Sequence, residues 1–116
     1  MMDNECIFCK IAAGEASAAI VYHDDEITAF WDRLPAAPVH ILVIPNRHMD
    51  NLNEMDAEDV PMIGRMVLKA REIAARQGVD ESGYRLILNT GLDGCQTVGH
   101  LHLHLIGGKK LPIYRE

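Results

Sequence analysis

The chain has 116 residues, of which 48% are apolar and 24% charged, and its formal net charge is −6 at pH 7. This composition predicts one compact domain over residues 1–116, and the negative charge argues against partners such as nucleic acid or an anionic membrane surface. The apolar runs are too short to span a bilayer, and we expect no secretory signal. Three cysteines do not suggest a disulfide scaffold, so a cytoplasmic location is expected.

The first half of the chain predicts a short helix and three strands. Residues 7–14 have apolar positions at helical spacing and end at a glycine. Residues 20–23 and 27–32 are predicted strands, joined by an acidic turn. After two prolines, the bulky apolar run 40–44 predicts a buried strand.

The second half predicts one long helix followed by two strands. Asp56 can cap a helix over residues 56–77, and Gly78 can end it. The predicted apolar stripe of this helix consists of Ile63, Met66, Val67, Ala70, Ile73 and Ala74. Residues 84–89 and 98–106 are the predicted strands. The order of elements predicts the α+β class with a mainly antiparallel sheet of five strands.

The last predicted strand carries alternating histidines and leucines. In an extended strand His100, His102 and His104 share one face, with neighbours roughly 6.6 Å apart. An ordinary polar face would use lysine, glutamate or threonine, so three imidazoles indicate chemistry. Two kinds of site remain open. A metal ion suits two of these histidines better than three, whereas a neutral imidazole can attack phosphorus while its neighbours stabilise charge.

This stretch resembles the signature of the histidine triad (HIT) family, in which two further apolar residues, here Leu105 and Ile106, follow the last histidine. The similarity extends over nearly the whole chain, through the blocks 6–11, 29–32, 38–45, 83–89 and 94–99. It points to the branch called Hint, whose members hydrolyse purine nucleoside phosphoramidates. The resemblance implies a HIT-like fold with one long and one short helix, in a homodimer whose sheets join into one of ten strands.

The resemblance implies catalytic roles for four residues. His102, the middle histidine, corresponds to the nucleophile that forms a nucleotidyl-imidazole intermediate, which water then hydrolyses. His104 corresponds to a donor of a hydrogen bond or a proton near the leaving atom. His40 matches a further pocket histidine, although a histidine that merely starts a strand is the alternative. Thr97 stands close to the leaving group, where many relatives have serine.

The resemblance also implies a nucleotide-binding site. The phosphate cradle corresponds to Asn89, Gln96, Thr97 and Val98. Asp32 matches the acid that accepts hydrogen bonds from both ribose hydroxyls. The apolar walls of the base pocket, for which core packing is the alternative, correspond to Ile7, Phe8 and Phe30. Trp31 departs from the family, which commonly has histidine there, and this leaves the shape of the base pocket open.

Cys6 and Cys9 are separated by two residues, a spacing found in zinc sites and in redox motifs. Many bacterial relatives with this pair bind a structural zinc, and the resemblance implies His48 and His100 as the other ligands. Such a site would tie the first helix to the start of the catalytic strand. A redox pair fits less well because it usually follows a strand in a βαβ unit, and two free cysteines are the third alternative.

The expected activity is hydrolysis at the α-phosphate of purine nucleotide derivatives such as adenosine 5'-phosphoramidate, which releases AMP or GMP and needs no organic cofactor. The alternatives are a dinucleoside polyphosphate hydrolase of the Fhit type and a zinc-stabilised nucleotide-binding or scaffold protein. Met62, Met66 and Ile73 are candidates for the dimer contact, although they can equally face their own sheet. The tail 109–116 is a candidate to reach the partner's pocket.

Overall fold

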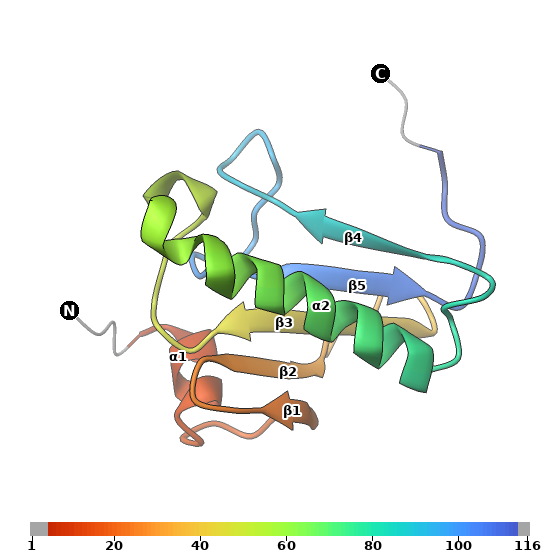
Figure 1. Ribbon diagram of the computed structural model, residues 1–116, viewed down its shortest axis with the longest axis horizontal. Coiled ribbons are helices and arrows are strands. Elements are labelled where there is room, and N and C mark those ends of the chain that lie inside the picture. The colour runs from red at the N-terminus through yellow and green to blue at the C-terminus, as the bar shows by residue number, and fades with distance from the viewer. Residues whose placement is uncertain (1–4, 114–116) are drawn as a thin grey trace.

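The computed structural model describes residues 5–113, and within this range the chain forms a five-stranded antiparallel sheet crossed by one long helix (Figure 1). The strand order is β1-β2-β3-β5-β4. The elements are α1 (Ile7–Ala12), β1 (Ile20–His23), β2 (Ile27–Trp31), β3 (Val39–Pro45), the 3-10 helices η1 (Leu52–Glu54) and η2 (Ala57–Asp59), α2 (Val60–Arg76), β4 (Tyr84–Leu88) and β5 (Leu103–Gly107). The predicted α+β class is confirmed. No helix in the described range is long and apolar enough to cross a membrane.

The central strand β3 is buried along its whole length, which explains its unbroken apolar run. Ile41 and Val43 belong to the core that α2 covers, whereas Leu42 belongs to the core under α1. Since side chains alternate along a strand, His40 points to the same face as Leu42. Leu42 pairs with His104 on β5, so both histidines lie on the α1 face of the sheet.

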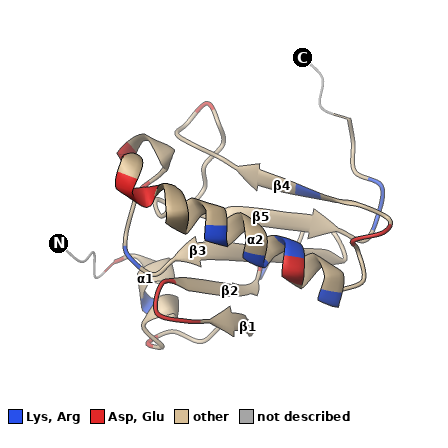
Figure 2. Ribbon diagram, in the orientation of Figure 1, with Lys and Arg blue, Asp and Glu red and all other residues tan. Residues whose placement is uncertain are grey.

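Helix α2 begins later than predicted. Residues 57–59 form a 3-10 turn, closed by a capping box between Asp56 and Asp59, and the α-helix starts at Val60. Pro61 occupies the first turn, where its missing N–H costs no hydrogen bond. Figure 2 shows acidic residues at this end and mainly basic residues along the rest of α2, with Glu72 among them, a distribution that the helix dipole favours.

The face of α2 that packs on the sheet is rotated from the predicted stripe. Its buried residues are Met62, Met66, Ala70, Ile73 and Ala74. Val67, predicted in the stripe, is 42% exposed because it lies one position away from this face. Met62, Met66 and Ile73 face their own sheet, so they do not supply the surface of a dimer contact.

Strand β5 is shorter than predicted, because the ladder starts at Leu103 rather than at residue 98. His100 and His102 therefore precede the strand. The backbone N–H of Leu101 donates to the Met49 carbonyl at 2.7 Å, and His100 Nε2 lies 2.8 Å from the Pro45 carbonyl oxygen. These bonds hold the segment against the end of β3 and the chain that follows it, outside the ladder.

Candidate active site

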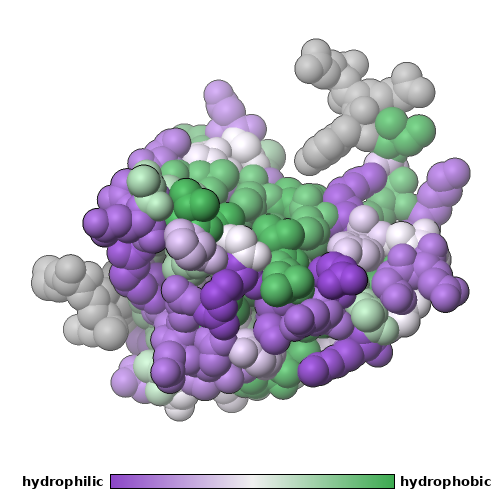
Figure 3. All heavy atoms as spheres, viewed as in Figure 1, coloured by the Kyte–Doolittle hydropathy of each residue, from purple (hydrophilic) through white to green (hydrophobic). Residues whose placement is uncertain are grey.

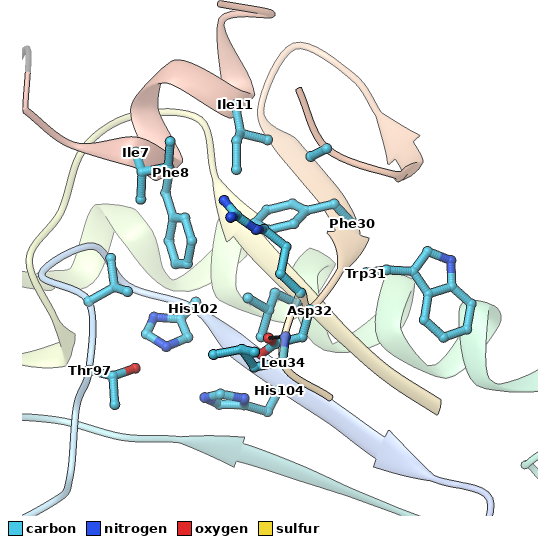
Figure 4. A pocket seen from close by; sticks show the side chains of 14 residues that line it. Ile7, Phe8, Ile11, Phe30, Trp31, Asp32, Leu34, Thr97, His102 and His104 are labelled. Carbon is cyan, nitrogen blue, oxygen red and sulfur yellow. Dashed lines mark hydrogen bonds between the residues drawn. The ribbon is translucent and has the colours of Figure 1, made fainter. Parts of the chain in front are cut away.

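A cavity of about 490 Å³ opens between α1, the end of β2 and the segment that leads into β5. Eight predicted site residues line it, namely Ile7, Phe8, Phe30, Asp32, Thr97, Val98, His102 and His104. Figure 4 shows the apolar side chains of α1 and Phe30 on one side, with Thr97, His102 and His104 on the other. The cavity thus has an apolar part and a polar part rich in imidazole, as a small-molecule site requires.

The side chain of His102 is held in one orientation. Its Nδ1 lies 2.7 Å from the carbonyl oxygen of His100, so Nδ1 carries the proton and donates it to this carbonyl. Phe8 packs edge-on against the ring, with centroids 5.2 Å apart. Burial lowers the pKa of His102 below its usual value. The ring is therefore neutral near pH 7, and its Nε2 offers a lone pair.

His40 and His104 form a second, directional arrangement. The backbone N–H of Ala36 donates to His40 Nδ1 at 3.0 Å, which places the ring proton of a neutral His40 on Nε2. This Nε2 lies 2.9 Å from His104 Nδ1 and 3.3 Å from Asp32 Oδ2. With Nδ1 of His104 accepting, the proton of neutral His104 is on Nε2. The series of hydrogen bonds that begins at the Ala36 N–H therefore leaves the Nε2–H of His104 as a free donor.

Two of the predicted phosphate ligands have other partners in the structure. Asn89 Nδ2 donates to the Gly94 carbonyl at 2.7 Å. Gln96 accepts a hydrogen bond from the Gly91 N–H at 2.9 Å and donates to the carbonyls of Asp50 and Val98. Neither residue is among the described residues that line the cavity. Their amides shape the loop 89–98, while Thr97 and Val98 reach the cavity.

Trp31 is among the residues that line the cavity, but its indole ring lies apart from the other side chains there (Figure 4). Figure 4 shows the ring pointing away from the other labelled side chains, and Trp31 packs against the core on the α2 side. Its neighbours on β2 explain this, because alternation places Phe30 and Trp31 on opposite faces. Five further lining residues were not predicted from the sequence, namely the apolar Ile11, Ala18, Leu34 and Leu42 and the basic Arg33. Ile11 was predictable because it lies one helical turn after Ile7.

Comparison with known proteins decides the family. The model of the family described as "Scavenger mRNA decapping enzyme C-term binding" matches residues 5–112. The purine nucleoside phosphoramidase of Escherichia coli K12 is 48% identical over 110 residues, which are 95% of this chain and 92% of that protein. A histidine triad protein from Clostridium difficile, 44% identical, superposes with a TM-score of 0.95 over 99% of this chain and 100% of its own.

The chain belongs to the histidine triad (HIT) family. It is a hydrolase, as the similarity to the phosphoramidase and the match to the family model show. The family's three histidines are His100, His102 and His104, of which the structure buries the first completely. The triad is therefore split, because His102 and His104 line the cavity while His100 faces the two cysteines near the N-terminus.

A second group of side chains in this HIT protein can hold a metal ion. Ligand atoms of Cys6, Cys9, His48 and His100 all lie within 4.8 Å of one another. The sulfur of Cys6 is 3.3 Å from His100 Nδ1, and that of Cys9 is 3.2 Å from His48 Nδ1. Sulfur and nitrogen ligands of one tetrahedral zinc would be about 3.5 Å apart, given usual bond lengths. The donor set and its spacing fit such an ion.

The surroundings of the two histidines support this interpretation. His48 Nε2 lies 2.7 Å from Asp50 Oδ1, and His100 Nε2 lies 2.8 Å from the Pro45 carbonyl oxygen. Both rings therefore donate from Nε2 and turn the lone pair of Nδ1 toward the sulfurs, which is how zinc-binding histidines are oriented. A 14 kDa zinc-binding protein of Brassica juncea is 39% identical over 109 residues, 92% of this chain and 96% of that protein.

The neutral state of His104 predicts how stability depends on pH. Burial and the neighbouring His102 and His40 lower its pKa to about 4. The unfolded chain takes up a proton at His104 near pH 6.5 and the folded chain only near pH 4, so stability falls as the pH falls through this window. Between pH 7 and pH 5, His104 should account for a loss of about 2 kcal/mol in the free energy of unfolding.

Urea titrations of the wild type and of His104→Gln at pH 7 and pH 5 measure this contribution. The wild type should lose about 2 kcal/mol more than the variant, because glutamine does not titrate. Protonation of the metal-ligand candidates affects both proteins alike and cancels. Equal losses in the two proteins would show that His104 titrates normally in the folded state.

Proposed function

We propose that this HIT protein hydrolyses purine nucleoside phosphoramidates and related nucleotides at the α-phosphorus, through a nucleotide bound covalently to His102. The observation that carries the proposal is the orientation of His102, whose Nδ1 proton is bound to the His100 carbonyl so that Nε2 is free to attack. The similarity to a purine nucleoside phosphoramidase over nearly its whole length supports the substrate class.

The proposed reaction has two displacements. In the first, His102 Nε2 forms a bond to the α-phosphorus, the bond from phosphorus to the leaving nitrogen breaks, and that nitrogen takes up a proton. In the second, water attacks phosphorus and releases a proton, and the electron pair of the broken bond returns to His102 Nε2. The N–H of His104 and the hydroxyl of Thr97, both at the cavity, stabilise the charge that develops during these steps.

The rest of the cavity suits the remainder of a nucleotide. Asp32 lines it beside the triad and has carboxylate oxygens that can accept bonds from two ribose hydroxyls. The apolar walls formed by α1 and Phe30 suit the faces of a purine. Asn89 and Gln96 act by holding the loop that presents Thr97, rather than as direct ligands of the phosphate. The product would be AMP or GMP.

Zinc is the proposed metal of the Cys6, Cys9, His48 and His100 cluster. A bound zinc would supply a structural cross-link and no chemistry in the reaction. Cys6 is the N-cap of α1, and His100 lies two residues before the proposed nucleophile His102. The four ligands would thereby fix α1, which forms one wall of the cavity, relative to His102.

A homodimer through β4 and α2 is the proposed assembly. β4 is an edge strand whose five residues are all half-buried, and Val67 and Leu68 of α2 are 42% and 49% exposed. Figure 3 shows apolar residues gathered over this side of the molecule. The Arg85 guanidinium donates to the Pro112 carbonyl at 2.6 Å, which ties the described part of the tail to β4. Residues 114–116 of the tail lie outside the described range.

A comparison of two substrates tests the proposed reaction. An adenosine 5'-phosphoramidate and a diadenosine polyphosphate are offered separately, and kcat/KM is measured for each. We expect the phosphoramidate to be hydrolysed at least about tenfold faster, since an amine leaving group requires no second nucleotide site. A faster reaction of the dinucleotide would favour the Fhit-type alternative. Binding of both without turnover would favour a nucleotide-binding protein with weak catalysis.

A further inference from the structure

Arg33 is the basic side chain of the cavity and has no role in the reaction described above. Among the described residues that line the cavity, it is the one with a permanent positive charge. Within residues 5–113 its guanidinium has no hydrogen-bond or ion-pair partner. The adjacent Asp32 instead accepts from the Leu34 N–H at 2.8 Å and lies 3.3 Å from His40. A guanidinium with five free N–H donors is thus available to a ligand.

The position of Arg33 limits which part of a bound nucleotide its guanidinium can contact. This step rests on the proposed function, in which the phosphate lies at His102 and the ribose at Asp32. Arg33 follows Asp32 beyond the end of β2, where the other lining residues are the apolar side chains of α1, Phe30 and Leu34. Apolar walls serve the faces of a purine but leave its polar edge without partners. Among the described side chains that line this side, the guanidinium is the one with free donors near the edge, because the indole ring of Trp31 points away from the others (Figure 4).

We propose that Arg33 reads the edge of the purine and makes the cavity prefer 6-oxopurines, such as guanine, over adenine. Guanine presents two acceptors, O6 and N7, at the spacing that a guanidinium contacts with two parallel N–H groups. Adenine presents N7 beside an amino group, which is a donor and repels a second N–H. A bidentate pair of this kind at a partly open site discriminates the two bases by about tenfold.

Equilibrium binding of products tests this inference without requiring turnover. Dissociation constants of GMP, IMP, AMP and 7-deaza-GMP are measured by calorimetry for the wild type, for Arg33→Met and for Arg71→Met. Arg71 is an exposed arginine of α2 outside this cavity, so its variant controls for the loss of one charge. Methionine keeps the aliphatic length of arginine and removes every donor.

We expect GMP and IMP to bind the wild type about tenfold more tightly than AMP, and 7-deaza-GMP to lose most of this advantage. Arg33→Met should bind all four nucleotides with similar affinity, and Arg71→Met should behave as the wild type. Equal affinities in the wild type, or a guanine preference that survives in Arg33→Met, would overturn the inference. So would an equal loss for GMP and AMP, because that result assigns Arg33 to the phosphate.

The two proposals fail in different ways. If none of the four nucleotides binds the wild type, the cavity is not a nucleotide site, and both proposals fall. If GMP and AMP bind equally, the nucleotide site stands and only the role of Arg33 is wrong. Because Arg33 is exposed and has no partner among residues 5–113, Arg33→Met should unfold at the same temperature as the wild type, which thermal denaturation checks.

Discussion

Replacing His102 with alanine is expected to lower kcat/KM for a purine nucleoside phosphoramidate by about 10⁴-fold or more. The covalent path disappears with Nε2, and no other described imidazole of the cavity has its Nδ1 proton bound to a carbonyl and its Nε2 free. His102→Gln should lose as much activity while filling more of the space, which separates lost chemistry from lost packing.

His23→Ala is the matched control for this prediction. His23 is an exposed histidine of β1 whose Nδ1 lies 2.9 Å from Thr28 Oγ1, and it does not line the cavity. The control should keep activity within about twofold of the wild type, and circular dichroism should show both variants folded. Activity of His102→Ala within tenfold of the wild type would rule out His102 as the nucleophile.

Removing a ligand of the metal cluster should have the largest effect on stability. Cys9→Ala is expected to reduce bound zinc from about one ion per chain to almost none and to lower the free energy of unfolding by about 3 kcal/mol or more. The sulfur of Cys9 is within 3.5 Å of Nδ1 of both His48 and His100, so its loss removes the ligand that lies next to both histidines. Metal analysis and urea titration measure the two effects.

Cys95→Ala provides the control, because Cys95 is an exposed thiol outside the cluster. It should retain zinc and the stability of the wild type, because the thiol is exposed and alanine keeps the Cβ that meets the positive φ of 60° at this residue. Protein purified without added zinc that contains well below one ion per chain, and a Cys9→Ala variant as stable as the wild type, would together argue for free cysteines.

Much of the fold could be predicted from local patterns. The run on β3 indicated a buried strand, and the glycine after α2 indicated where that helix ends. The start of β5 could not be predicted, because alternation of histidine and leucine continues through residues 100–102 while the ladder does not. Which face of α2 is buried also depends on the sheet beneath it, so Val67 was misplaced by one position.

The site was predictable in composition but less so in arrangement. The triad pattern identified the imidazoles, yet only the fold shows that His100 turns toward the cysteines while His102 and His104 face the cavity. Asn89 and Gln96 were predicted as phosphate ligands from their position in a segment that matches the family. Their hydrogen bonds to the backbone of the loop depend on the folded structure and could not be predicted from the sequence. Arg33 carries no pattern of its own, so its place in the cavity required the structure.

Trapping the covalent intermediate tests the central claim most directly. The protein is mixed with a purine nucleoside phosphoramidate, quenched in neutral denaturant within milliseconds to seconds, and analysed by mass spectrometry of the intact chain and of its peptides. We predict one nucleoside monophosphate per chain, attached to His102 and absent from His102→Ala. A nucleotide attached to another residue, or product formation with no labelled chain at any time, would contradict nucleophilic attack by His102.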